Sequence, residues 1–259
     1  MANQKCDNCK NRETCEGAKP NVNVHRISSV CDYIKLTMQF RERFQISFRG
    51  HRRKDFKLSP EYKFTKIGRS YNDSKEVLDR FKNRSYSMPK PQHIEQFDDW
   101  RWLFFAQHSG LATKLLDWTS NPLVALYFAV ENIISKQQDD VFGCVWGLHL
   151  TKELFQLPEK GSPDDINEWV MVNSPPFNER IERQSGKFTY HPEPSNIVDD
   201  SEIMKKAVLW FFCIKEKPIV NQRIRKHLTI MNIHHANLFH DYDGIASFIN
   251  NELFATVIK

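Results

Sequence analysis

The chain has no long hydrophobic run. Its longest purely apolar stretches, such as residues 207–214, are far shorter than the roughly 20 residues that a membrane-spanning helix requires. The first ten residues are polar, so the N-terminus shows no secretion signal. These two absences predict a cytoplasmic protein with no membrane partner.

The chain also has no internal repeat, no low-complexity segment and no strong excess of one charge. Its 259 residues are 40% hydrophobic and 27% charged, which is an ordinary composition for one large globular domain or one domain with appendages. The formal net charge is +5 and is spread along the chain. This charge permits binding of a nucleotide or a nucleic acid but does not require it.

Six cysteines without a secretion signal favour thiols or a metal site over disulfides. The polar segment 1–26 is predicted to be an N-terminal appendage, and it contains the zinc-knuckle spacing Cys6-x2-Cys9. Cys15 together with Cys31 or His25 would complete four zinc ligands. A second Cys-x-x-Cys pair is missing, so a tail with free thiols is the alternative, and we favour it.

Hydrophobic patterns predict both helices and strands along the rest of the chain. We expect helices over residues 27–44, 75–81, 94–108, 219–231 and 245–254, and strands over residues 45–48, 141–150 and 207–214, the last inside a sheet. Irregular structure is expected over residues 58–67 and 152–177, and a turn with a short extended piece over residues 232–239.

Polar residues gather between a strand and a helix in the segment 106–132. A Gln107-His108 pair precedes a turn at Gly110, and a short strand then ends in Asp117-Trp118-Thr119. A helix follows from Pro122, capped by Ser120 or Asn121. The positive end of such a helix favours an anion such as a phosphate. The simpler interpretation is a well-capped core helix after a buried strand.

This segment resembles the signature of the FRG domain family, which is named for a Phe-Arg-Gly that occurs here at residues 48–50. The family motif reads Gln-His-x-Gly-x-Pro-Thr-Arg-Leu-Leu-Asp-Trp-Thr and continues as Pro-Leu-x-Ala-Leu-x-Phe-Ala. The chain matches it from Gln107 to Ala129 with two departures, Ala112 for Pro and Lys114 for Arg. Segments 180–188 and 238–244 also resemble the family, so residues 27–259 are expected to form the FRG domain.

The order of these features is similar, more distantly, to that of ADP-ribosyltransferases. That similarity implies an α+β fold with a curved, split or mostly antiparallel sheet flanked by helices, and NAD as the cofactor. It implies a catalytic glutamate in the C-terminal half of the chain, for which Glu182 is the candidate. It also implies that the residues that bind the cofactor lie in the Phe-Arg-Gly motif and in the longer motif. These are Arg49, Gly50, Gln107, Thr113, Lys114 and Thr119.

Several functions remain open on these residues. The first is a bacterial or phage-related cytosolic effector that transfers ADP-ribose to a protein or nucleic-acid target or hydrolyses NAD. A second is a module that binds a dinucleotide or nucleotide without chemistry. A third is a nucleic-acid-processing enzyme that uses the basic run 51–54 with His108 and Asp117 as an acid–base pair. For both His108 and Asp117, a purely structural role is as plausible as a catalytic one.

Overall fold

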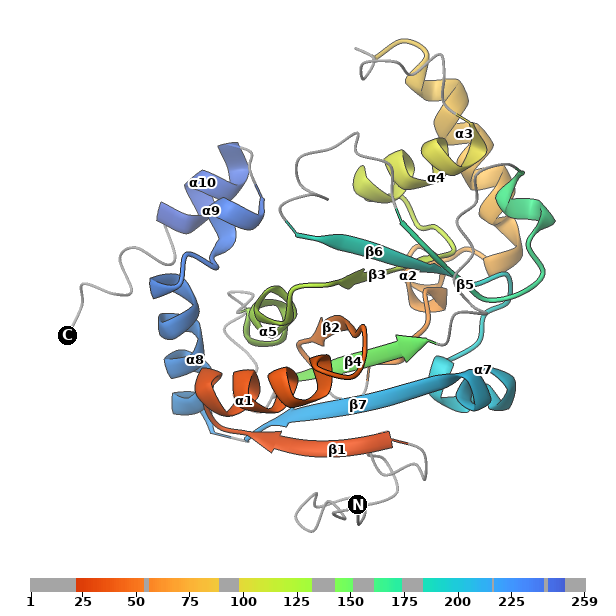
Figure 1. The fold of residues 1–259 in the computed structure, drawn as a ribbon. Helices are drawn as coiled ribbons and strands as arrows, with labels where there is room; N and C mark the ends of the chain where they lie inside the picture. The colour runs from red at the N-terminus through yellow and green to blue at the C-terminus, as the bar shows by residue number, and fades with distance from the viewer. Residues whose placement is uncertain are drawn as a thin grey trace.

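A curled, seven-stranded sheet forms the centre of the protein (Figure 1). The computed structural model describes residues 22–53, 56–88, 98–131, 143–150, 161–173, 184–215, 217–239 and 242–249. The strand order is β1-β7-β4-β2-β3-β6-β5. The bounds are Val22–Ile27 for β1, Ser47–His51 for β2, Leu115–Thr119 for β3, Cys144–Leu150 for β4, Val170–Val172 for β5, Gly186–Tyr190 for β6 and Ala207–Ile214 for β7.

The sheet is mostly antiparallel, as the sequence predicts. Among the described strands, only β1 and β7 pair in parallel, and β7 lies between β1 and β4, inside the sheet. The sheet opens between β2 and β3, which share a single paired position, Phe48 with Thr119. Five residue pairs join β2 to β4 and five join β3 to β6. The two halves of the sheet therefore separate on one side of Phe48.

Three helices cover one face of the sheet. They are α1 (Val30–Arg41), α5 (Pro122–Val130) and α8 (Pro218–Ile230). Local signals start two of them, because the Ser29 hydroxyl accepts from the Asp32 N–H and the Asn121 side chain accepts from the Leu123 N–H. Burial of their apolar residues against alternate residues of β4 and β7 forms the largest core cluster.

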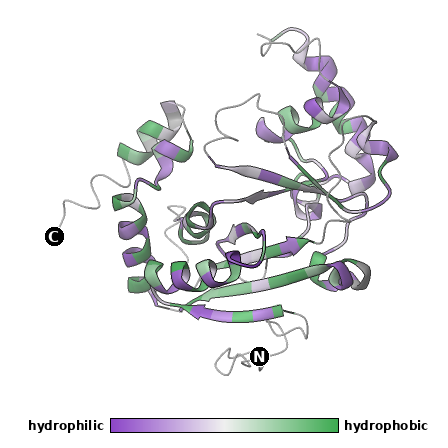
Figure 2. Ribbon diagram, in the orientation of Figure 1, coloured by the Kyte–Doolittle hydropathy of each residue, from purple (hydrophilic) through white to green (hydrophobic). Residues whose placement is uncertain are grey.

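The opposite face carries a second core cluster. Trp146 and Phe211 alternate along β4 and β7 with residues of the first cluster, and Trp118 of β3 belongs to the same second cluster. They pack against Ile197 and against Ile203 of α7 (Ser201–Lys206). In Figure 2, α5 and β7 are almost entirely hydrophobic, as expected for elements buried between layers.

Aromatic residues of α4 (Asp99–His108) fill a third cluster beside β3 and β6. Trp100 and Phe104 are buried there, which confirms the prediction that this aromatic segment is central. Helix α3 (Ser74–Ser85) lies against α4 and has no buried residue among its twelve. It is accordingly coloured largely hydrophilic in Figure 2.

Four short elements differ from the sequence prediction. Helix α2 (Glu61–Lys66) lies in a predicted loop, β5 in the predicted irregular segment, and helix α9 (His235–Leu238) in a predicted turn. Each has three to six residues, too few for a periodic pattern. Strand β1 begins at Val22, so residues 22–26 of the predicted appendage are hydrogen-bonded to β7.

The last described helix, α10, spans Tyr242–Phe248 and begins earlier than predicted. No helix among the described residues has the length and hydrophobicity needed to cross a membrane.

Candidate functional site

A cleft of about 540 Å³ lies where β2 and β3 separate. Its lining comes from β2, α2, the end of α4, β3 and α5, together with Gln184 before β6. Six of the lining residues are charged, namely Arg49, Arg52, Lys63, Lys66, Asp117 and Glu131. Five are aromatic, namely Phe48, Phe56, Tyr62, Trp118 and Phe128. The cleft therefore offers both charge and flat apolar surface to a ligand.

Asp117, whose side chain is 50% exposed, is the centre of a polar network in this cleft. The amide nitrogen of Gln107 donates to both carboxylate oxygens, at 2.9 and 3.0 Å. The amide orientation is fixed because the Thr113 hydroxyl donates to the Gln107 oxygen. Lys63 Nζ and Arg49 NH1 each lie 3.6 Å from Asp117 Oδ2.

The two cations keep Asp117 ionised. Burial raises the pKa of Asp117, but Lys63, Arg49 and the hydrogen bonds that the carboxylate accepts, including those from Gln107, together lower it by more, so the pKa lies below its usual value. Burial also lowers the pKa of Lys63 and of Arg49, which the nearby carboxylate partly offsets. Asp117 thus holds two partly desolvated cations in place.

Arg49 bridges the gap between the separated strands. Its NH1 donates to the main-chain oxygen of Asp117 at 2.6 Å, and its Nε donates to His51 Nε2 at 2.9 Å. A guanidinium only donates, so His51 must accept at Nε2 and carry its own proton on Nδ1. Burial, with the Arg49 charge, holds the pKa of His51 well below its ordinary value. His51 is a neutral support for Arg49.

Thr119 connects β3 to the segment that precedes β6 through its hydroxyl group. Its hydroxyl donates to the main-chain oxygen of Gln184 at 2.5 Å and accepts from the Asn121 N–H at 3.0 Å. The Gln184 amide in turn donates to the main-chain oxygen of Leu238 in α9, at 3.0 Å. The Thr119 hydroxyl is therefore occupied by structural hydrogen bonds.

Glu131 is a cleft residue that sequence reasoning missed. It follows directly after α5, and its carboxylate lies 3.3 Å from Nδ1 of His235 in α9. Tyr127, one helical turn earlier, places its hydroxyl 3.5 Å from the same carboxylate oxygen. A signal was present, because Glu131 and Asp117 are the two acidic residues of segment 106–132.

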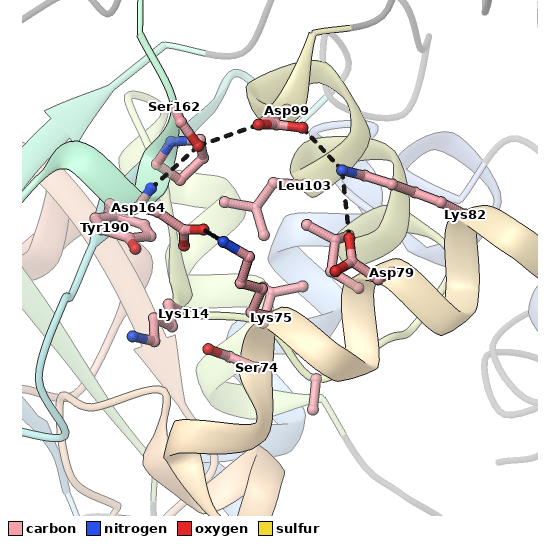
Figure 3. A pocket seen from close by; sticks show the side chains of 14 residues that line it. Ser74, Lys75, Asp79, Lys82, Asp99, Leu103, Lys114, Ser162, Asp164 and Tyr190 are labelled. Carbon is pink, nitrogen blue, oxygen red and sulfur yellow. Dashed lines mark hydrogen bonds and ion pairs between the residues drawn. The ribbon is translucent and has the colours of Figure 1, made fainter.

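Several predicted site residues lie elsewhere. Thr113 and Lys114 line a smaller cavity of about 130 Å³, shown in Figure 3 with Lys114 at its edge. Ion pairs cross that cavity between Lys75 and Asp164, at 2.7 Å, and between Lys82 and Asp99, at 2.8 Å.

Gly50 lines the cleft, but α5 occupies the space beside its Cα. His108 is half-buried at the end of α4 and is not among the residues that line the cleft. Arg49, Asp117 and Thr119 are therefore the predicted residues that the fold brings together with Gln107 and Gly50 in one cleft.

Glu182, Cys6, Cys9 and Cys15 lie outside the described residues. Cys31 is exposed on α1. The described part of the chain contains no cluster of three or more metal-ligating side chains. A zinc site at the four cysteines stays a prediction.

Comparison with known families gives one match. Residues 45–138 match the family model of the FRG domain. No significant match was found among curated proteins or among solved structures. The matched segment includes both strands that border the cleft, β2 and β3, and the helix α5 together with Glu131, which follows it. The segment that resembles the FRG domain therefore supplies both edges of the cleft.

Proposed function

We propose that the cleft binds NAD or a closely related dinucleotide, and that the protein transfers or hydrolyses its ADP-ribose part. The observation that carries this proposal is the composition of the cleft at the opening of the sheet. Cationic, aromatic and carboxylate side chains line one volume of about 540 Å³, within the usual size range of ligand sites.

The charge of the cleft suits a pyrophosphate. Its four cationic side chains outnumber its two carboxylates. Arg49 and Lys63 are engaged with Asp117, whereas Arg52 and Lys66 have no ion-pair partner among the described residues. Two cations that line a cleft without an ion-pair partner in the described part of the chain favour a doubly charged anion.

Exposed aromatic rings suit the rings of a dinucleotide. Phe56 and Tyr62 are stacked, with centroids 6.0 Å apart and planes 18° from parallel. Their exposed fractions are 36% and 56%, which is high for large hydrophobic side chains. A base or a nicotinamide ring that stacks here would cover this apolar surface.

The arrangement also supports the similarity in order to ADP-ribosyltransferases. The sheet opens between the strand that carries Arg49 and the strand that carries Thr119, and a carboxylate lies in the opening. A binding module without chemistry is the second candidate. It is favoured by the engagement of Asp117 and Thr119 in internal contacts.

Calorimetric titration with NAD, together with chromatographic measurement of released nicotinamide, tests the proposal. The double variant Arg52→Ala/Lys66→Ala should weaken NAD binding by about tenfold or more, since it removes two charge-assisted contacts. The matched control Lys35→Ala/Lys226→Ala removes the same charge from exposed positions on α1 and α8 and should leave binding unchanged.

Each outcome separates the candidates. Binding with nicotinamide release supports the enzyme, and binding without release supports the binding module. If wild-type protein shows no affinity for NAD or for ADP-ribose, the cleft has another ligand and the proposal fails.

A further inference from the structure

The two carboxylates in the cleft have opposite electrostatic surroundings. Two cations lie 3.6 Å from the Asp117 carboxylate, and the Gln107 amide nitrogen donates to both of its oxygens. Its negative charge is therefore largely cancelled for any group that enters the cleft. A catalytic carboxylate for ADP-ribose transfer must instead present negative charge to the ribose, where positive charge develops as nicotinamide leaves.

Glu131 meets that requirement. Among the described residues its ionisable partner is His235, and its other polar neighbour is the Tyr127 hydroxyl. No lysine or arginine of the described chain forms an ion pair with it. The side chain is 20% exposed and lines the cleft, so its charge is poorly screened by water.

We infer that Glu131 is the catalytic carboxylate of the cleft and that His235 is its positioning residue; this inference rests on the function proposed above. Asp117, which the sequence singles out, then organises Arg49 and Lys63 rather than taking part in the chemistry.

His235 is well placed to fix the Glu131 carboxylate. Its Nδ1 lies 3.3 Å from Glu131 Oε1 and 3.1 Å from the Tyr127 hydroxyl. Its ring stacks on Phe239, with centroids 4.3 Å apart, and Phe239 meets the cleft residue Phe128 edge-on. Packing against Phe239 thus fixes the His235 imidazole, and the imidazole in turn fixes the position of the Glu131 carboxylate.

Cleavage of NAD requires only water or an acceptor hydroxyl as the second reactant. The bond between ribose C1′ and the nicotinamide nitrogen breaks, and its electron pair leaves with the nicotinamide, which becomes neutral. The Glu131 carboxylate stabilises the positive charge left on the ribose. The oxygen of water or of the acceptor then bonds to C1′, and its proton passes to Glu131 and on to solvent.

Kinetics of nicotinamide release by the full chain test the role of Glu131. Glu131→Gln keeps the shape and removes the charge, so kcat should fall by about 100-fold or more while KM changes by less than about threefold. The matched control Glu168→Gln alters an exposed glutamate away from the cleft and should change neither constant. Asp117→Asn should instead raise KM and lower the melting temperature, because Arg49 and Lys63 lose their counter-charge.

His235 is tested by loss and rescue. His235→Ala should lower kcat by about tenfold at unchanged KM. His235→Asn should restore much of it, since the Asn amide nitrogen occupies about the place of Nδ1. A purely structural role would lower the melting temperature of the Ala variant and would show no rescue of kcat by Asn.

The outcomes distinguish the two levels of the proposal. If wild-type protein releases nicotinamide and Glu131→Gln keeps kcat within about threefold, the role of Glu131 is overturned while the proposed function stands. If wild-type protein binds NAD without releasing nicotinamide, the catalytic role of Glu131 is overturned and the binding module remains. If it does not bind NAD, both proposals fall.

Discussion

At the scale of single residues, much of the FRG signature builds the opening in the sheet rather than facing a ligand. Gln107 orients Asp117, and Thr119 anchors the chain before β6. Lys114, where the family usually has Arg, donates to the Pro192 main-chain oxygen at 2.9 Å and lies 5.2 Å from the Tyr71 ring centroid. A single acceptor and an aromatic face suit a point charge, so the planar fork of Arg is dispensable here.

Gly50 is required because α5 lies directly against β2. A Cβ at this position would be 1.9 Å from the Ala125 main-chain oxygen and 2.7 Å from the Ala129 main-chain nitrogen. Both neighbours are backbone atoms of a buried helix and cannot move aside independently. We expect Gly50→Ala to destabilise the fold by about 3 kcal/mol through overpacking, measured by urea denaturation.

Gly147 on β4 provides the control. A Cβ there would meet the Ile46 side chain at 3.2 Å, and a side chain can rotate away. Gly147→Ala should therefore change the free energy of unfolding by less than about 1 kcal/mol. Equal effects of the two substitutions would show that α5 does not approach β2 as closely as described.

At the scale of elements, a buried polar chain joins three strands behind the cleft. Trp169 Nε1 donates to His191 Nδ1 at 2.9 Å, so His191 carries its proton on Nε2. That nitrogen donates to the Thr189 hydroxyl at 2.9 Å, and Trp118 Nε1 donates to the same oxygen at 3.0 Å. The network ties β3 to β6 and to the start of β5, and thereby fixes one edge of the cleft.

Thr189→Val should break this network while preserving shape. It leaves two buried donors, on Trp118 and His191, without an acceptor, at a cost of about 2–4 kcal/mol. The same substitution at exposed Thr65 on α2 is the control and should cost less than about 0.5 kcal/mol. Equilibrium denaturation of both variants compares them, and a small effect of Thr189→Val would mean that water reaches these donors.

Elements with a strong local pattern were predictable from the sequence, and short elements were not. β7 is an eight-residue apolar run, and α5 begins with a cap and a proline, so both were identified. β5 and α9 have three and four residues and exist because of what they pack against. Their stability comes from tertiary contacts, which leave no periodic trace in the sequence.

The same distinction explains the candidate site. Arg49, Asp117 and Thr119 stand at strand ends within recognisable motifs, so their presence in one cleft was predictable. Glu131 was missed because its partner His235 lies on α9, an element that the sequence did not reveal. His108 and Gln107 are adjacent on α4, but successive helix positions point about 100° apart, so one can reach Asp117 without the other.

At the scale of the whole molecule, the cleft depends on more than the segment that matches the FRG family. β4 supports β2, and β6 supports β3, and both lie outside residues 45–138. The α9 contacts of Glu131 and Gln184 also come from outside it. The whole described sheet therefore holds the two edges of the cleft in place.

Buried neutral histidines should make the whole fold sensitive to mild acid. Burial lowers the pKa of His191 to about 3 and that of His51 well below its ordinary value, and burial also lowers the pKa of His25. An unfolded chain protonates each of these rings near pH 6.5. Below that pH the unfolded state binds more protons than the native state, so stability is complete above pH 6.5 and is lost as the pH falls.

The free energy of unfolding, measured by urea denaturation from pH 7.5 to 4.5, should therefore decline below pH 6.5. His51 and His191 should each contribute a slope of up to about 1.4 kcal/mol per pH unit. The low pKa of Asp117 affects stability in a different pH range, because the stabilisation that the ionised Asp117 contributes is lost only below about pH 3.9. Repeating the series in about 0.5 M salt screens surface charges and should leave most of the slope. A free energy that stays constant from pH 7 to 5 would mean that water reaches His51 and His191, and that the support of Arg49 by a neutral imidazole is wrong.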